Sequence, residues 1–215
     1  MIKFKNKKLK ESSKKWISRQ ISDVFTQEKK IQGYRSRSAF KLIDIQRKFK
    51  FLKNNSLVLD LGSSPGGWSQ VLAKKIKKGK IVSVDILPMK KIDKVTFILG
   101  DFLSPNIKKK ILELFNGKVD IIVSDMAANT TGNKNLDSYR TSELNFDAID
   151  FSQEILNKNG ILLCKLFMGA EFKEIRKKAS SIFKKVIFYK PNPSRQDSRE
   201  IYMYCNNLLE KSSIN

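Results

Sequence analysis

Apolar residues along the chain change repeatedly between two spacings. Strands are predicted where short apolar runs occur, at residues 56–61, 80–87, 95–99, 119–124 and 160–167. Helices are predicted where apolar residues recur every three or four positions, at about residues 67–77, 104–115, 138–158 and 169–183. Because strands and helices alternate, the pattern indicates a parallel sheet with helices on both faces.

The last part of the chain departs from this alternation. KKVIFYKP (184–191) and EIYMYC (200–205) are two strand-like runs with no helix between them, so one of them is expected to run antiparallel at the sheet edge. The pattern therefore predicts an α/β fold with a mostly parallel, seven-stranded sheet and one antiparallel edge strand.

Several residues at the ends of the predicted helices are suited to capping. Ser12 or Ser13 can cap a helix near the N-terminus, after a basic tail at residues 1–11. Ser38 can cap a second helix in the same way. The long helix at 138–158 is expected to end at Asn159-Gly160, which is a suitable C-cap.

Positive charge is the most unusual feature of the composition. The 215 residues include 43 Lys or Arg against 21 Asp or Glu, and the net charge of +22 points to a polyanionic partner. Compositional bias toward lysine can explain part of the excess, but 16 basic and only 4 acidic residues fall within residues 1–50. There Arg35 and Arg37 lie beside Tyr34, residue types suited to phosphates and to base stacking. Nucleic acid is therefore favoured over a membrane surface.

Other classes of protein are disfavoured by what the sequence lacks. No apolar run approaches the ~20 residues of a membrane helix, and the N-terminus has no signal-peptide pattern. The chain has no histidine, and its two cysteines, Cys164 and Cys205, lie in apolar runs typical of reduced core residues. We expect one cytoplasmic domain without a metal, in which any general base is Lys, Asp, Glu or Tyr.

The stretch DLGSSPGGWSQ (60–70) joins a predicted strand to a predicted helix through a glycine turn. It has neither the Gly-Lys-Ser/Thr of a P-loop nor the spacing of a dinucleotide-binding GxGxxG turn. Asp85 ends the second strand, where a carboxylate can accept both hydroxyls of an adenosine ribose. Asp101 follows the third strand, where it can accept from an adenine amino group beside Phe102. Adenosine without a polyphosphate site suggests S-adenosylmethionine, with Asp60 near its charged amino-acid end.

Four charged residues are candidates for chemistry, namely Lys41, Asp125, Lys165 and Glu200. Asp125 ends the fourth strand, and Lys165 interrupts the apolar strand ILLCKLF, where a charge is costly unless it is paired or used. Because the ends of the first, fourth and fifth strands meet at one cleft, Asp125 and Lys165 are expected to be neighbours. From the residues alone, Lys41 stays open as an exposed helix position, and Glu200 as a partner of a nearby arginine.

The motifs DLGSSPGGWSQ, SDMAAN, KLF and SREIY, with RSRSAFKL upstream, resemble those of the RrmJ/FtsJ family of ribosomal RNA 2′-O-ribose methyltransferases. The similarity runs from about Ser12 to about Cys205. It implies a Rossmann-like class I methyltransferase domain at 31–207, a basic RNA-contacting extension and helix at 1–30, and a tail at 208–215. Two positions depart from the family pattern, since Ala128 stands where proline is usual and Met168 where glutamine is common.

The resemblance also implies roles for individual residues. A catalytic Lys-Asp-Lys-Glu set falls on Lys41, Asp125, Lys165 and Glu200. Contacts to S-adenosylmethionine fall on Gly66, Trp68, Asp85, Asp101 and Asp125. Arg35 and Arg37 are expected to contact RNA phosphates. Lys165 is the expected base that removes the proton of a ribose hydroxyl. Asp125 is expected to position either Lys165 or the cofactor methyl group, and Glu200 to hold either a lysine or the ribose.

The implied reaction is methyl transfer to the ribose 2′-oxygen of a uridine in the A-loop of large-subunit (23S) ribosomal RNA. We expect a monomer that acts on the 50S subunit or its precursor during late assembly. Two alternatives stay open: a basic RNA-binding ribosome assembly factor with weak or no catalysis, and a 2′-O-methyltransferase of tRNA or of the mRNA cap. A lysine inside a strand disfavours the first, because a pure binding protein has no use for it. The lack of an extra cap-binding domain disfavours the second.

Overall fold

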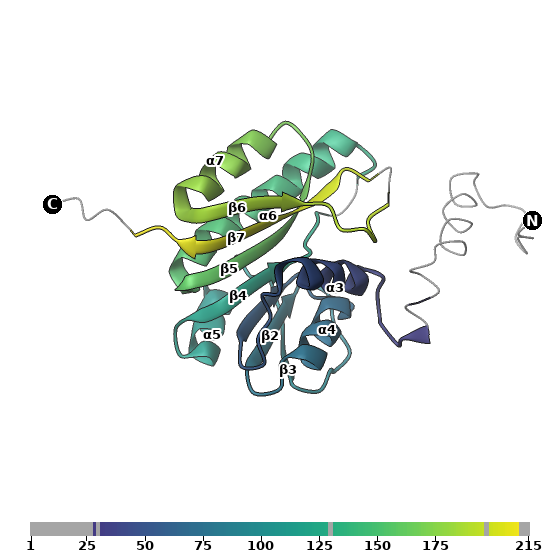
Figure 1. Ribbon diagram of the computed structural model, residues 1–215, viewed down its shortest axis with the longest axis vertical. Helices are drawn as coiled ribbons and strands as arrows, with labels where there is room; N and C mark the ends of the chain where they lie inside the picture. Colours follow the sequence, from purple (N-terminus) through teal and green to yellow (C-terminus); the bar gives the residue numbers. More distant parts are fainter. Residues whose placement is uncertain (1–27, 29–30, 129–130, 196–197, 211–215) are drawn as a thin grey trace, which may run out of the picture.

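Seven strands form a single sheet in the computed structural model, which describes residues 28, 31–128, 131–195 and 198–210 (Figure 1). The spatial order of these strands is β3-β2-β1-β4-β5-β7-β6. Their bounds are β1 (Leu57–Leu61), β2 (Lys80–Asp85), β3 (Val95–Leu99), β4 (Val119–Ser124), β5 (Leu156–Phe167), β6 (Phe183–Tyr189) and β7 (Glu200–Leu208). β1 to β5 pair in parallel, as predicted. The helix expected after Ser12 or Ser13 lies outside the described residues.

Antiparallel pairing is confined to one side of the sheet. β7 pairs antiparallel with both β5 and β6, so β6 is the edge strand and β7 lies one place inside it. Parallel neighbours need a crossover connection of about a dozen residues or more, and residues 190–199 are too few for one. The predicted fold class is therefore confirmed, with the antiparallel strand next to the edge rather than at it.

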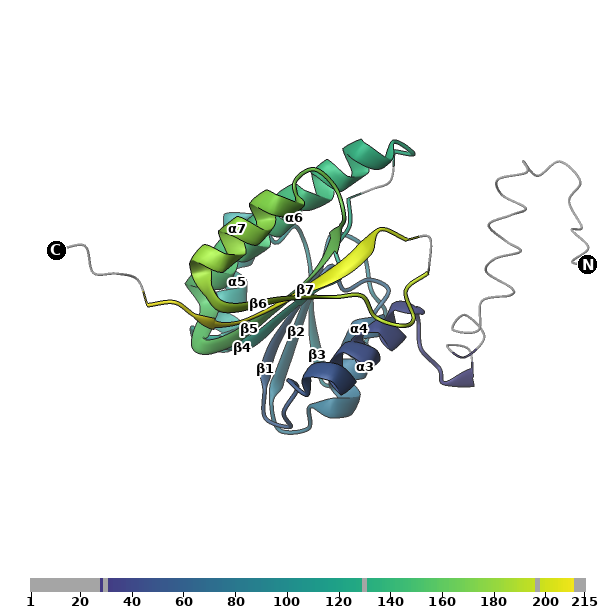
Figure 2. The ribbon, with the colours of Figure 1, turned by 45° about the horizontal axis from the view of Figure 1, so that its top comes forward.

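Helices cover both faces of the sheet (Figures 1 and 2). The labelled helices are α3 (Ser38–Phe49), α4 (Gly67–Lys75), α5 (Pro105–Phe115), α6 (Lys134–Ile155) and α7 (Phe172–Ile182). Leu42 of α3 and Trp68 of α4 are buried in a core cluster on one face. Ile111, Phe151 and Ile175 bring α5, α6 and α7 into a second cluster on the other face. Burial on both faces explains why the central strands are almost continuously apolar. None of the described helices has the length and hydropathy that a membrane crossing requires.

The predicted C-terminal end of the long helix is wrong. α6 ends at Ile155, and β5 begins at the next residue, so Asn159-Gly160 lies within a strand and caps no helix. The side-chain amide of Asn157 donates to Asp120 Oδ1 of β4 at 2.8 Å, which fixes this part of the chain to the sheet. The chain after Ile155 is thus paired with β4, through Leu156 opposite Val119 and through Asn157, and does not continue the helix.

The start of α3 also differs from the prediction. Ser38 is the first residue of the helix and not its cap; the N-cap position is Arg37, whose side chain makes no capping hydrogen bond. The Ser38 hydroxyl lies 2.6 Å from the Ser36 hydroxyl. The Ser38 carbonyl accepts a hydrogen bond from the Trp68 indole at 2.9 Å, which ties α3 to α4.

The register of β5 with β7 brings polar side chains to one face of the sheet. Lys165 lies directly opposite Tyr202, and Phe167 lies opposite Glu200. Directly opposed residues share a face, and so do residues two apart along a strand. Lys165, Tyr202 and Glu200 therefore all face the side of the sheet that α3 and α4 cover.

Candidate active site

A glycine turn closes the carboxyl end of β1. Gly62 has a φ of +72°, and a Cβ built at this position would lie 2.4 Å from Met126 Cγ. Only glycine combines this backbone conformation with such a close approach at low cost. The turn therefore lets the loop after β4 pack directly against the end of β1, and the two together form one wall of a pocket.

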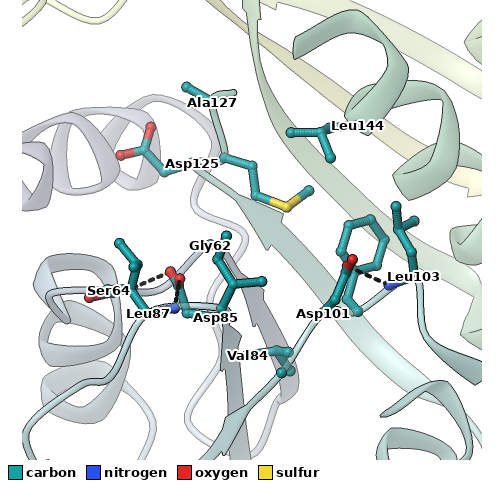
Figure 3. Close-up of a pocket in the computed structure, with 14 residues that line it drawn as sticks. Gly62, Ser64, Val84, Asp85, Leu87, Asp101, Leu103, Asp125, Ala127 and Leu144 are labelled. Atoms are coloured by element: carbon teal, nitrogen blue, oxygen red, sulfur yellow. Dashed lines mark hydrogen bonds between the residues drawn. The ribbon is translucent and has the colours of Figure 1, made fainter. Parts of the chain in front are cut away.

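This pocket has a volume of about 360 Å³ and lies at the carboxyl ends of β1 to β4. Its lining includes Gly62, Asp85, Asp101 and Asp125 at the ends of successive strands, and Leu144 of α6 (Figure 3). In an open α/β sheet, ligands bind outside these strand ends near the point where the strand order reverses, which here lies between β1 and β4. The volume and position suit a small organic ligand of nucleoside size.

Two carboxylates in the pocket are held in fixed orientations by backbone amides. Asp85 accepts the Ser64 amide on one oxygen at 2.7 Å and the Leu87 amide on the other at 2.8 Å. Asp101 accepts the Leu103 amide at 3.0 Å on Oδ1 (Figure 3). A carboxylate offers about four acceptor sites, so both groups keep acceptor capacity toward the pocket. They are therefore preorganised to accept hydrogen bonds from a ligand that carries hydroxyl or amino donors.

Asp125 links this pocket to a second group of polar side chains. In Figure 3 its carboxylate is directed away from Asp85 and Asp101. Lys165 Nζ lies 3.1 Å from Asp125 Oδ1 and donates to the Asp125 carbonyl at 2.5 Å. The Tyr202 hydroxyl donates to the same Oδ1 at 2.8 Å. The two contacts from Nζ fix the Lys165 side chain against Asp125, and the bond from Tyr202 fixes the Asp125 carboxylate itself, at the edge of the pocket.

The electrostatic surroundings keep Asp125 ionised. Burial alone would raise the pKa of this carboxyl, but Lys165, Lys41 and the hydrogen bond from Tyr202 together lower the pKa below its ordinary value. The same arrangement acts in the opposite sense on Tyr202, since burial, Asp125 and Glu200 raise the pKa of its phenol well above 10.0. At neutral pH, Tyr202 therefore stays protonated and donates a hydrogen bond to the ionised Asp125 carboxylate.

A second ion pair lies beside the first. Lys41 Nζ of α3 and Glu200 Oε2 of β7 are 2.6 Å apart, and the two side chains are only 13% and 10% exposed. Lys41 Nζ also lies 5.9 Å from the centre of the Tyr202 ring, so this tyrosine contacts both pairs. The prediction from the residues alone left Lys41 and Glu200 open; the structure brings them together with Asp125 and Lys165.

A basic hollow of about 280 Å³ opens over this second pair, lined by Arg37, Lys41, Arg195, Ser198 and Glu200. Arg37 donates to the Pro193 carbonyl at 2.6 Å. Burial and the neighbouring Arg195 lower the pKa of Arg37, and Glu200 opposes them. Two guanidinium groups and an ammonium group around one hollow make a site for an anion.

Three residues expected in the site have other surroundings. The Trp68 side chain of α4 is buried against α3 and Tyr202. Neither Trp68 nor Gly66 lines the pocket. A Cβ at Gly66 would meet Arg35 Nη1 at 2.9 Å. Arg35 itself donates to the carbonyls of Pro65, Lys90 and Lys91, so its guanidinium holds two loops together. These bonds use three of its five N–H donors, and its contact with RNA phosphates stays a prediction.

Sequence reasoning missed Tyr202. The signal was present, because Tyr202 follows Glu200 by two positions and therefore shares its face of the strand. Its position opposite Lys165 depends on the β5–β7 register, and local patterning gives no measure of that register.

Comparisons with known proteins agree with this geometry. Residues 34–208 match the family described as FtsJ-like methyltransferase. The chain is 44% identical over 196 residues to the ribosomal RNA large subunit methyltransferase E of Pelagibacter ubique, covering 91% of this chain and 97% of that protein. It is 40% identical over 208 residues to the protein of the same name in Rickettsia akari, covering 94% and 92%.

Solved structures show the same fold. A Plasmodium falciparum protein described as a ribosomal RNA methyltransferase is 35% identical, with a TM-score of 0.75, and the match covers 83% of this chain and 100% of that chain. A Streptococcus mutans protein described as a methyltransferase, in complex with SAH, has a TM-score of 0.51 at 15% identity over 77% and 97% of the chains, a likeness of fold alone. The fold is thus that of a Rossmann-like methyltransferase. The chain belongs to the FtsJ-like methyltransferase family, and the predicted membership is confirmed.

Proposed function

We propose that this protein transfers a methyl group from S-adenosylmethionine to the ribose 2′-oxygen of a uridine in the A-loop of large-subunit ribosomal RNA. We further propose that it acts in the cytoplasm, as a monomer, on the 50S subunit or its precursor. The names of the curated relatives support the RNA class, and the two linked ion pairs support the chemistry. Because those relatives match along almost their whole length, the proposal concerns the activity of the entire chain.

The residues present fit S-adenosylmethionine. Gly62 leaves room where any Cβ would collide, and Asp85 and Asp101 offer oriented acceptors on neighbouring strands. We assign Asp85 to the ribose hydroxyls and Asp101 to the adenine amino group, with Asp125 at the reactive end of the pocket. When bound, this cofactor supplies a methyl group on a positively charged sulfur. Gly66 and Trp68 shape the turn from behind and do not enter the pocket in this assignment.

We assign Lys165, in its neutral amine form, as the group that accepts the proton of the ribose 2′-hydroxyl. A neutral hydroxyl is a poor nucleophile, so a positioned base that takes its proton contributes about 10²–10⁴-fold to the rate. The Asp125 carboxylate, 3.1 Å from Lys165 Nζ, stabilises the ammonium that forms when the proton arrives. The Asp125 carbonyl and Tyr202 hold the geometry before the reaction, which reduces the reorganisation needed in the transition state.

The basic hollow is assigned to the RNA strand. Arg37 and Arg195 are placed to contact backbone phosphates, and the Lys41–Glu200 pair lies between them and Lys165. Glu200 can accept from a ribose hydroxyl, whereas Lys41 can donate to a ribose or phosphate oxygen. The 2′-hydroxyl is both the reacting atom and the group that distinguishes RNA from DNA.

The single observation that carries the proposal is the position of Lys165. It is 8% exposed in a central strand, yet its amino group reaches a carboxylate that also lines the pocket assigned to the methyl donor. Burying a lysine in a strand is costly, and a protein that only binds RNA gains nothing from it. A methyltransferase that acts on a hydroxyl group uses such an amino group to accept the hydroxyl proton.

The proposal is tested by following a labelled methyl group from S-adenosylmethionine into RNA of immature large ribosomal subunits. The parent protein is expected to transfer label. Lys165→Ala is expected to lose about 10²-fold or more in rate while it binds S-adenosylmethionine with a similar Kd. Lys158→Ala, which removes an exposed lysine paired with Glu210, is the matched control and should retain full activity.

Two results would contradict the proposal. Full transfer by Lys165→Ala would remove this lysine from the chemistry. Tight RNA binding without any transfer by the parent protein would favour the assembly factor instead.

A further inference from the structure

One face of α3 contacts the connection between β6 and β7. This connection spans residues 190–199, of which 190–195 and 198–199 are described. Arg37, Lys41 and Asp44 are spaced by four and three positions, so they share one side of the helix. Arg37 and Lys41 belong to the basic hollow described above. Asp44 lines neither that hollow nor the donor pocket, and the proposed reaction assigns it no task.

Asp44 is buried, with 7% exposure, and its contacts converge on one oxygen. The Tyr189 hydroxyl donates to Asp44 Oδ2 at 2.7 Å, and the Asn192 amide donates to the same oxygen at 3.2 Å. The other oxygen lies 3.8 Å from Arg47, whose side chain is 78% exposed, so this ion pair is weak. The carboxylate therefore serves mainly as a double acceptor for the end of β6 and the start of the connection.

Three consecutive residues of the connection are each held by a different part of the site. The Asn192 amide binds Asp44, and the Pro193 carbonyl binds Arg37 at 2.6 Å. The Ser194 hydroxyl donates to Glu200 Oε1 at 3.1 Å, on the carboxylate whose Oε2 binds Lys41. Residues 192–194 are therefore hydrogen-bonded to Asp44 at one end and to the Lys41–Glu200 pair at the other.

The packing of α3 itself does not require Asp44. The helix is attached to the sheet by Ala39, Leu42 and Ile45, which are all fully buried in the core cluster of that face. The Tyr189 ring also packs edge-on against Phe49, at 5.7 Å between ring centres. Burial, with a smaller contribution from Asp44, raises the pKa of Tyr189 to about 12, so its hydroxyl remains a donor at neutral pH.

We propose that Asp44 is a positioning residue for the RNA side of the active site. By holding Tyr189 and Asn192, it fixes residues 192–195 against α3, and this sets the Lys41–Glu200 pair and Arg195 for the RNA strand. Asp44 touches neither the methyl donor nor the RNA. The inference rests on the proposed function only for the identity of the substrate, because the contacts that carry it lie within the protein.

The test compares Asp44→Ala with Asp44→Asn. Alanine removes the acceptor of two hydrogen bonds, and kcat/KM for the RNA substrate is expected to fall about tenfold, mainly through KM. Asparagine keeps one carbonyl oxygen, which is sufficient because both donors converge on Oδ2, so kcat/KM should stay within about twofold of the parent. The Kd for S-adenosylmethionine should be unchanged in both variants, since residues 190–195 do not line the donor pocket.

Two further variants separate positioning from folding. Tyr189→Phe removes only the hydroxyl and should lower kcat/KM about threefold in a chain that keeps its ring packing. Asp150→Ala, which removes a surface acid paired with Lys178 on the other face, is the control and should leave kcat/KM unchanged. Hydrogen exchange of the segment 189–195 should be faster in Asp44→Ala than in the parent, and should return to the parental rate in Asp44→Asn.

The inference is overturned by any of three results. These are parental kinetics in Asp44→Ala, an equal loss in Asp44→Asn, or a loss of donor affinity as large as the loss of activity. The exchange measurement does not depend on the substrate. The parent protein could methylate no RNA while hydrogen exchange of residues 189–195 still becomes faster in Asp44→Ala. The proposed function would then be wrong, and the role of Asp44 in holding this segment would still be supported.

Discussion

Asp60 offers a test in which a buried charge controls stability. It is the last residue but one of β1 and has no exposed surface. Its Oδ2 accepts the Ser69 hydroxyl at 2.6 Å, and its Oδ1 has no hydrogen-bond partner among the residues that the structure describes. The pKa of Asp60 is raised from 3.8 to about 7, chiefly by burial and also by the neighbouring Asp125 and Asp85, while the hydrogen bond from Ser69 opposes the rise. Asp60 was expected to lie near the amino-acid end of the methyl donor. Its side chain does not line the pocket, although the pocket residues Asp125 and Asp85 act on its charge, so that expectation stays a prediction.

The consequence for stability follows from the sign of this shift. The folded state holds the Asp60 proton more tightly than the unfolded state, so the free energy of unfolding falls as pH rises from about 4 to about 7. Each pH unit between about 4 and 7 lowers the free energy of unfolding by about 1.4 kcal/mol. Between pH 5 and pH 8, ionising Asp60 therefore costs the folded state about 3 kcal/mol.

Asp60→Asn cannot ionise and should escape this loss. Chemical unfolding followed by circular dichroism at pH 5, 6, 7 and 8 gives the free energy of unfolding of both proteins. The difference, variant minus parent, should become more favourable to the variant by about 3 kcal/mol between pH 5 and pH 8. Titrations common to both proteins cancel in this difference. A difference that stays constant with pH would refute the reasoning, because it would mean that Asp60 does not change its charge in this range.

Two other predictions concern hydrogen bonds at the site. Tyr202→Phe removes the donor to Asp125 Oδ1, so the pKa of Asp125 should rise, the acid limb of the kcat/KM profile should move to higher pH, and the rate at neutral pH should fall about tenfold. A pH–rate profile that coincides with that of the parent would contradict this. Thr141→Val should cost about 1 kcal/mol in urea unfolding, because the Ala128 amide donates to Thr141 Oγ1 at 3.2 Å. In an Ala128→Pro background, which lacks that amide hydrogen, the cost should be smaller, because only the bond from the Thr141 hydroxyl to the Asp137 carbonyl at 2.8 Å is then lost. An equal cost in both backgrounds would show that the bond from Ala128 contributes nothing.

The fold was predictable because its signals are local. The change of apolar spacing in residues 57–76 marks a strand, a turn and a helix without reference to the rest of the chain. Strand ends of a parallel sheet gather at one edge, so the positions of Asp85, Asp101 and Asp125 in one pocket followed from sequence order. The neighbourhood of Asp125 and Lys165 followed by the same reasoning.

What could not be predicted depends on partners that are distant in sequence. Arg35 carries the residue type of a phosphate ligand, but three backbone carbonyls from two loops surround its guanidinium. From the sequence, Asp44 is an ordinary acidic residue of a helix. Its role depends on hydrogen bonds from Tyr189 and Asn192, which lie 145 and 148 positions later in the chain. Tyr202 likewise gains its role from the strand register. The hydrogen-bond partners of a side chain and the charges around it depend on the tertiary structure. The local pattern of residues carries little information about them.

The central claim is that the Lys165–Asp125 pair directs a methyl group onto a ribose oxygen of ribosomal RNA. Its most direct measurement is mass spectrometry of nucleosides from immature large subunits after reaction with the parent protein and S-adenosylmethionine. We expect a single new 2′-O-methyluridine, absent when Lys165→Ala replaces the parent. A methyl group on a base, or a ribose methylation that persists undiminished in Lys165→Ala, would contradict it.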